Sequence, residues 1–169
     1  MPNTSRFGRL AWLWLTLLVF VLDQATKFYF DNNLTMYQQI EVIPGYFSWT
    51  LAYNTGAAFS FLSDAGGWQR WFFTGIAVVV SAVLVVWLKR LKAHETWLAV
   101  ALALVLGGAL GNLVDRVIFG HVVDFILVHR HTTWYFPAFN LADSAITCGA
   151  ILLALDMFKS GKSAEKSHE

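Results

Sequence analysis

Four long apolar stretches run through the sequence and decide what this chain can fold into. They cover residues 10–30, 71–88, 97–114 and 141–158. Each approaches the roughly 20 apolar residues that an α-helix needs to cross a hydrocarbon layer about 30 Å thick. Hydrophobic residues make up 57% of the chain and charged residues only 14%, whereas soluble domains carry roughly 25% charged residues. We therefore expect an α-helical integral membrane protein with four transmembrane helices.

The first apolar stretch resembles two kinds of segment, a transmembrane helix and a cleavable signal peptide. Arg6 and Arg9 precede the apolar run 10–22, which is the pattern of a signal peptide. No small-residue cleavage site follows, and apolar residues resume at 28–30. We interpret the stretch as a retained helix.

The placement of Lys and Arg predicts how the helices are oriented. Positive residues in short loops are held on the cytoplasmic side of a membrane. Eight of the twelve lie before the first stretch, between the second and third, or after the fourth. We therefore expect cytoplasmic termini and one membrane-embedded domain, residues 1–158, followed by a polar cytoplasmic tail, residues 159–169. Segments 31–70 and 115–140 then face the outer side of the membrane.

These two outer segments contain the residues that favour β-structure. Residues 40–43 and 47–53 flank Pro44 and Gly45 and are typical of a hairpin, and residues 122–128 are typical of a further strand. We expect a small extracytoplasmic β-sheet at the membrane surface.

Ionisable residues inside the predicted spans need partners, because a charge in a membrane costs at least a few kcal/mol. Asp23 and Lys27 are spaced i, i+4 in the order that favours an intrahelical ion pair. Asn112 and Asp115 share one face of the third helix, and the neighbouring Arg116 is placed to reach a carboxylate or the lipid headgroups. We interpret these residues as structural.

Two aspartates suggest chemistry. Asp143 follows Asn140 by three residues, which is the spacing of a helix capping box, and a capping role alone accounts for it. Asp124 lies within an apolar strand, where an unpaired carboxylate is costly. Placing Asp124 beside Asp143 explains both residues as an aspartyl dyad that activates a water molecule.

Other catalytic patterns fit the sequence poorly. There is no Gly-x-Ser-x-Gly and no His-Glu-x-x-His sequence. His129 and His131 lack a matching set of metal ligands, so we interpret them as a solvated rim and expect no metal and no cofactor. Cys148 lies more than a turn beyond Asp143 on the fourth helix, which disfavours a nucleophilic role. A net charge of +1 argues against a nucleic acid partner.

Two other functions remain open at this stage. Intramembrane polar residues also mark the paths of ion- or proton-coupled carriers, although the inner halves of the second and third helices are almost wholly apolar and offer no continuous polar path. A noncatalytic membrane assembly factor would keep the outer sheet without needing either aspartate as an acid.

Five short blocks of the sequence together resemble the bacterial lipoprotein signal peptidases, also called signal peptidase II. In chain order the blocks are Asp23, Gln24 and Lys27; Asn54, Thr55, Gly56, Ala57, Ala58 and Phe59; Gly108, Gly111, Asn112, Asp115 and Arg116; Val123, Asp124 and Phe125; and Phe139, Asn140, Ala142 and Asp143. Any one block is weak, but the set in this order is specific.

The resemblance implies an aspartic endopeptidase with Asp124 and Asp143 as its catalytic pair. It implies that the substrate is a diacylglyceryl-modified prolipoprotein, cleaved on the N-terminal side of the lipidated cysteine. Its supporting and substrate-binding residues would be Asn54, Gly56, Asn112, Arg116 and Asn140, and its structural residues Asp23, Lys27 and Asp115. Membrane lipid is a further expected partner, the protein is expected to be a monomer, and segment 55–70 is a candidate lid.

Overall fold

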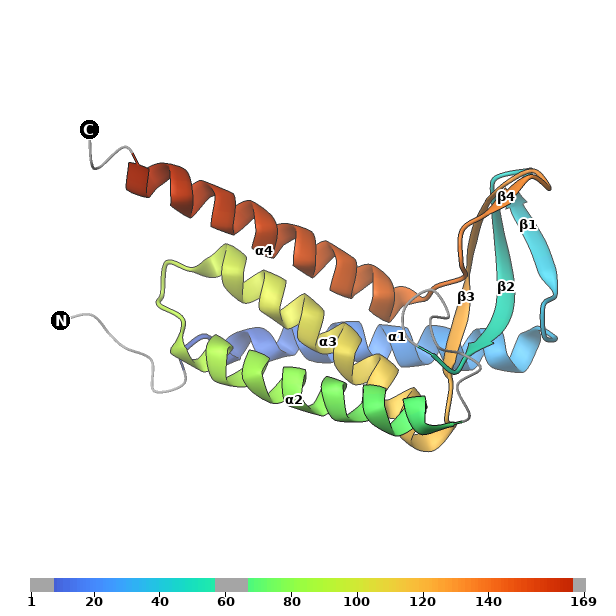
Figure 1. Ribbon diagram of the computed structural model, residues 1–169, viewed down its shortest axis with the longest axis horizontal. Coiled ribbons are helices and arrows are strands. Elements are labelled where there is room, and N and C mark those ends of the chain that lie inside the picture. Colours follow the sequence, from blue (N-terminus) through green and yellow to red (C-terminus); the bar gives the residue numbers. More distant parts are fainter. Residues whose placement is uncertain (1–7, 57–66, 166–169) are drawn as a thin grey trace.

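A computed structural model of the protein describes residues 8–56 and 67–165. Its helices are a short 3₁₀-helix, Gly8–Trp12, followed by α1 (Leu13–Asn33), α2 (Trp68–Arg90), α3 (Thr96–Ile118) and α4 (Leu141–Glu165). All four α-helices are long and apolar enough to span a membrane. They form an elongated bundle with a small β-sheet at one end (Figure 1). This architecture confirms the expected fold class.

Three of the observed helices, α2, α3 and α4, are longer than predicted, whereas α1 has the predicted 21 residues but begins and ends three residues later. The ends predicted at residues 30, 88, 114 and 158 were too early, because the helices continue to Asn33, Arg90, Ile118 and Glu165. Hydropathy detects only the apolar part of a helix, which lies in hydrocarbon. The polar residues beyond that part continue the same α-helical hydrogen bonding. Part of the predicted tail, residues 159–165, therefore belongs to α4.

The central helix of the bundle is α3. Within the described chain 56% of its apolar window is buried, against 17–22% for the other three helices, and in Figure 1 it lies between α4 and α2. Small residues on α3 allow this close packing, as is common between membrane helices. At Gly111 an added Cβ would collide with the carboxylate of Asp23 on α1. Gly111 thus lets α1 bring a charged side chain against the α3 backbone.

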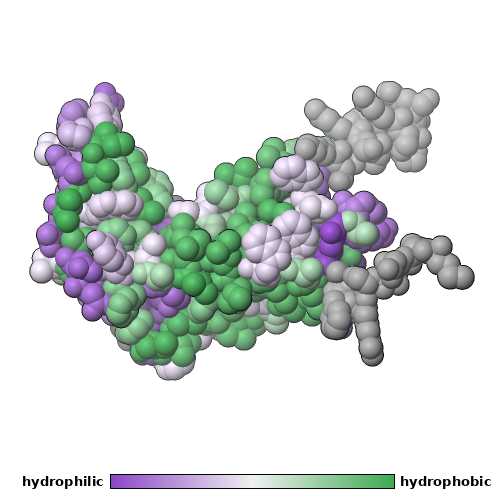
Figure 2. All heavy atoms as spheres, turned by 180° about the vertical axis from the view of Figure 1, so that it is seen from behind, coloured by the Kyte–Doolittle hydropathy of each residue, from purple (hydrophilic) through white to green (hydrophobic). Residues whose placement is uncertain are grey.

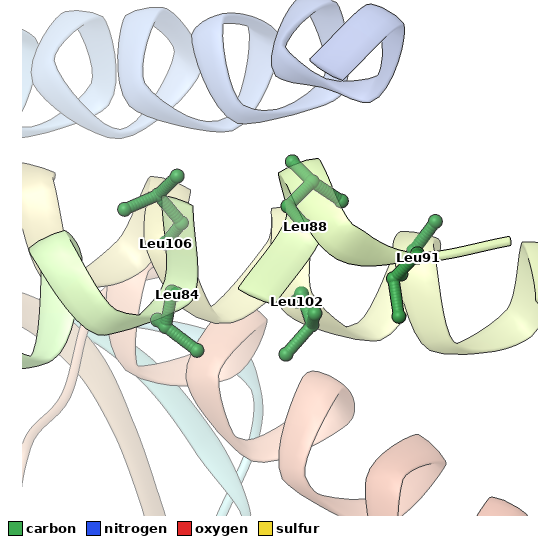
Figure 3. Close-up of a cluster of buried hydrophobic side chains, with 6 residues drawn as sticks. Leu84, Leu88, Leu91, Leu102 and Leu106 are labelled. Atoms are coloured by element: carbon green, nitrogen blue, oxygen red, sulfur yellow. The ribbon is translucent and has the colours of Figure 1, made fainter. Parts of the chain in front are cut away.

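A leucine-rich cluster packs α2 against α3 away from the sheet (Figure 3). Its buried members are Leu84, Leu88, Leu91, Ala99, Leu102 and Leu106. Lipid is as apolar as these side chains, so the cluster stabilises the bundle through close packing rather than through exclusion of water. The remaining helix surface is apolar and faces outward: Figure 2 shows hydrophobic residues along the helices and hydrophilic ones gathered at the sheet and at the opposite helix ends.

The sheet has four antiparallel strands in the order β1-β2-β3-β4. They are β1 (Gln39–Ile43), β2 (Phe47–Asn54), β3 (Val122–Arg130) and β4 (Trp134–Tyr135). The predicted hairpin and third strand are confirmed, whereas the two-residue β4 was not predicted. Gly45 in the hairpin turn has φ +78°, and an added Cβ would lie 2.6 Å from Nδ1 of His131. Both facts require glycine at this turn.

Two sets of contacts fix the sheet relative to the helices. The ring of Phe30, near the end of α1, stacks on Phe125 of β3 with 4.4 Å between centroids, and lies 4.9 Å from the ring of Trp49. The backbone of Phe139, just before α4, exchanges hydrogen bonds with Ile126 of β3 at 2.8 and 3.1 Å. The start of α4 is therefore held beside β3, and this places the polar residues of both elements in one site.

Candidate active site

Asp124 is a buried carboxyl group in the middle of the sheet. It faces inward from β3 and its side chain is only 2% exposed. Nδ2 of Asn140 donates to Oδ1 of Asp124 at 2.7 Å, and Nδ2 of Asn54 donates to Oδ2 at 3.2 Å. Burial, together with the nearby charge of Asp143, raises the pKa of Asp124 to about 7. The group is thus poised to hold or release a proton near neutral pH.

Asp143 lies in the first turn of α4 and forms a reciprocal capping box with Asn140. The backbone N–H of Asp143 donates to Oδ1 of Asn140 at 2.9 Å, and the backbone N–H of Asn140 donates to Oδ2 of Asp143 at 3.3 Å. The other carboxylate oxygen, Oδ1, accepts from Nδ2 of Asn112 on α3 at 2.7 Å. The predicted capping geometry is confirmed, and it leaves Asp143 fixed in orientation.

Asn140 joins the two aspartates into one network. Its side-chain amide donates to Asp124, and its backbone N–H donates to Asp143. The two carboxyl groups are close enough for the charge of one to raise the pKa of the other, as described for Asp124. Such a pair, sharing a proton, supplies a base and an acid at one place.

A second charged network lies beside the first, between α1 and α3. Nζ of Lys27 is 2.8 Å from Oδ2 of Asp23 and 2.7 Å from Oδ2 of Asp115, and it donates to Oδ1 of Asn112 at 2.9 Å. These contacts use all three hydrogens of the ammonium group. Gln24 closes the network by donating to Oδ1 of Asp115 at 2.9 Å. The predicted Asp23–Lys27 pair is confirmed, and Asp115 is its second acid.

Asn112 connects this charged network to the aspartate pair. Its Oδ1 accepts from Lys27, which fixes the amide so that Nδ2 points to Asp143. The other acid of the network also reaches α4, because Oδ1 of Asp23 accepts from the backbone N–H of Ala142 at 2.8 Å. The ion pairs therefore hold the first turn of α4 in place as well as satisfying their own charges.

Arg116 and Gly56 lie on the other side of the aspartate pair. Nη2 of Arg116 donates to the carbonyl of Gly56 at 3.0 Å, and Nη1 donates to the carbonyl of Asn112 at 3.2 Å. In the described chain the hydrogen bonds of the guanidinium thus go to backbone carbonyls rather than to the carboxylate that the sequence suggested. The N–H of Gly56 donates to Oδ1 of Asn54 at 3.0 Å. Arg116 and Asn54 consequently hold the same glycine from two sides.

A largely apolar pocket of about 410 Å³ lies against Asp143. Its walls come from the chain before α4, including Phe136 and Phe139, and from the α4 residues Ile146 and Cys148. A carboxylate at the edge of an apolar pocket is an arrangement suited to a substrate with large nonpolar groups.

One of the two histidines differs from the sequence-based interpretation, whereas His131 is exposed as expected. His129 was expected at a solvated rim, but its side chain is buried, and its Nε2 lies 3.0 Å from Oγ of Ser48 on β2. Its Nδ1 lies 3.0 Å from the carbonyl of His131, which is exposed in the turn after β3. The prediction failed because the cross-strand partner Ser48 is 81 residues away. Among the described residues no three His, Cys, Asp or Glu side chains are grouped to hold a metal ion.

Sequence reasoning left Gln24 without a role, although an amide in a membrane span is itself a signal of a polar partner. It donates to Asp115 and, at 3.2 Å, to the carbonyl of Gly111. The candidate lid, segment 55–70, falls mostly on residues 57–66, which lie outside the described residues.

Comparison with known proteins agrees with this geometry. Residues 15–159 match the family model described as signal peptidase (SPase) II. A Pseudomonas putida protein named lipoprotein signal peptidase is 76% identical over all of both chains, and a Pseudomonas aeruginosa protein of the same name is 74% identical over 99% of both. A solved bacterial membrane enzyme structure superposes with a TM-score of 0.80, at 33% identity over 90% of each chain. The resemblance of the five sequence blocks is confirmed: the chain belongs to the signal peptidase II family of membrane peptidases.

Proposed function

We propose that the protein is an aspartic endopeptidase that removes signal peptides from diacylglyceryl-modified prolipoproteins, cutting on the N-terminal side of the lipidated cysteine. The observation that carries this proposal is Asn140, which binds Asp124 and Asp143 at once beside an apolar pocket. The substrate class is supported by the relatives named lipoprotein signal peptidase.

The raised pKa of Asp124 makes it the proton donor of the pair. A water molecule held between the two groups loses a proton to the carboxylate of Asp143 as its oxygen attacks the scissile carbonyl carbon. Asp124 gives its proton to the carbonyl oxygen, and the product is a neutral gem-diol. The diol then collapses: the C–N bond breaks, the leaving nitrogen takes the proton from Asp143, and a diol hydroxyl returns a proton to Asp124.

The neighbouring residues support this chemistry by fixing geometry and by binding the substrate backbone. Asn112 and Asn140 orient Asp143, while Asn54 and Asn140 orient Asp124. Nε of Arg116 is buried and has no hydrogen-bond partner among the described residues, so it is a donor left for a substrate carbonyl. Gly56 belongs to this site through its contacts with Asn54 and Arg116.

The apolar pocket beside Asp143 is the proposed place for the nonpolar part of the substrate. A signal peptide is itself apolar, and its attached acyl chains stay in lipid, so binding of these nonreacting parts would position the scissile bond. We place the sheet and the aspartates on the periplasmic side of the inner membrane, with both termini in the cytoplasm. The positive charges near the other helix ends, including Lys89 and Arg90, support this orientation. The protein acts as a monomer surrounded by membrane lipid.

Cleavage of a purified diacylglyceryl-modified prolipoprotein tests the proposal. The parent protein, Asp124→Asn and Asp143→Asn are compared in lipid, each checked for folding and each assayed with and without a chelator. Asp31→Asn is the matched control, because Asp31 is exposed and contacts only the hydroxyl of Tyr53 among the described residues.

Cleavage by the parent and the control that survives the chelator and is lost in both test variants would support the aspartic mechanism. If a folded test variant still cleaves, the replaced aspartate is not needed for catalysis and has a structural role. If the parent does not cleave, the carrier and the assembly factor become the better hypotheses.

A further inference from the structure

Arg70 binds the end of a neighbouring helix. It lies in the first turn of α2, and its Nε and Nη2 donate to the carbonyls of Arg116 and Val117, both at 2.7 Å. Because α3 ends at Ile118, these carbonyls belong to its last turn, where helical hydrogen-bond partners run out. A guanidinium at this point also meets the negative end of the helix dipole. The start of α2 and the end of α3 lie together at the sheet end of the bundle (Figure 1).

The same face of α2 holds the side chain of Arg116. Phe73 follows Arg70 by three residues, and its ring centre is 5.7 Å from Cζ of Arg116. Arg70 therefore grips the backbone of Arg116 while Phe73 lies against its guanidinium. Together they determine the direction in which the Arg116 side chain leaves α3.

The position of the Arg116 guanidinium affects the electrostatics of the aspartate pair. Arg116 interacts with the charges of Asp143 on α4, Asp124 on β3 and Asp115 on α3. Among the described residues, Lys27 of α1 also acts on Asp124, but its ammonium is already held by two carboxylates. Arg116 is consequently the positive charge whose distance from the aspartate pair depends on how α2 meets α3.

We infer that Arg70 is a positioning residue of the peptidase, which fixes the Arg116 guanidinium beside Asp124 and Asp143 by capping the end of α3. This inference rests on the proposed function for its effect on turnover, and on the geometry alone for its effect on the aspartates. Arg70 touches neither carboxyl group, so its contribution passes through Arg116.

Arg70→Gln, Arg70→Lys and the control Arg90→Gln test the inference in the full-length protein in lipid. The control removes the same charge from the exposed far end of α2. We expect Arg70→Gln to lower kcat about tenfold, with KM changed less than about twofold, by analogy with groups that orient metal ligands. Its pH–rate profile should move to higher pH by about half a unit or more, because a nearby cation favours the charged form of a carboxyl group. Arg70→Lys can still bind one carbonyl, so its kcat and its pH–rate profile should lie between those of the parent and of Arg70→Gln.

A second measurement does not depend on catalysis. Carboxyl ¹³C NMR of aspartate-labelled protein should give a higher pKa for Asp124 in Arg70→Gln than in the parent, and the parent value in Arg90→Gln. A folded Arg70→Gln variant with the parent titration and the parent pH–rate profile would overturn the inference, even if its activity falls with its stability. If Arg70→Gln does not fold, the titration of Asp124 and the pH–rate profile are measured on Arg70→Lys instead, and parent values in both would overturn the inference. Failure of the parent to cleave would refute the proposed function, while the titration would still decide the role of Arg70.

Discussion

Replacing Lys27 by Met should cost the protein much of its stability. Lys27 is 3% exposed, and the two acids that it neutralises, Asp23 and Asp115, are 0% and 1% exposed. Removal of the ammonium leaves two buried carboxylates with no cation between them and leaves Oδ1 of Asn112 with only the longer hydrogen bond, at 3.3 Å, from Nδ2 of Asn140. Breaking a buried ion pair by removing one partner costs about 3–5 kcal/mol. We expect a loss in that range for Lys27→Met.

Equilibrium unfolding in mixed micelles measures this loss. The double variant Lys27→Met/Asp115→Asn removes one of the stranded charges, and Asp23 keeps the N–H of Ala142 as a donor, so roughly half of the lost free energy should return. Lys89→Met is the control, since an exposed lysine should change stability by less than about 0.5 kcal/mol. A loss below about 1 kcal/mol for Lys27→Met, or a double variant less stable than the single one, would refute the view that this ammonium holds both acids.

Three further changes have defined outcomes. Because the pKa of Asp124 is about 7 in the folded protein and 3.8 in the unfolded chain, stability should fall by a few kcal/mol as the pH rises from about 4 to about 7, and Asp124→Asn should abolish this fall. If the difference in unfolding free energy between the parent and Asp124→Asn did not change with pH, the raised pKa of Asp124 would be contradicted. Asn140→Ala, which removes the cap of α4 and the link from Asp124 to Asp143, should lower stability by about 1–2 kcal/mol and kcat by more than tenfold, measured by unfolding and cleavage. Ser48→Ala leaves Nε2 of buried His129 without a partner and should cost about 1–2 kcal/mol with kcat unchanged; equal stability would mean that water replaces the hydroxyl.

The sequence was sufficient for features that depend on neighbours along the chain. Apolar length predicts the four helices, the i, i+4 spacing pairs Asp23 with Lys27, and the i, i+3 spacing predicts the capping box of Asn140 and Asp143. These interactions follow from the geometry of a single helix, so no knowledge of the bundle is needed to foresee them.

Interactions between distant segments could not be predicted from the residues alone. Asp115 reaches Lys27 because Gly111 lets α3 approach α1, and this approach depends on the packing of two whole helices. His129 is buried because its strand pairs with β2, where Ser48 supplies its partner. A pattern within one strand tells which residues alternate, but only the pairing of strands decides which face is covered.

The contact between Asp23 and the backbone of Ala142 also has a consequence for how the protein is made. It joins α1 to α4, which is synthesised later, across 119 residues of chain. Asp143, one position further on, comes into place only after α4 has packed against the helices that precede it in the bundle. A nascent chain in which α1 to α3 and the sheet have been made thus contains Asp124 but not yet Asp143. On the proposed mechanism, which needs both Asp124 and Asp143, the chain cannot cleave a substrate before α4 is inserted.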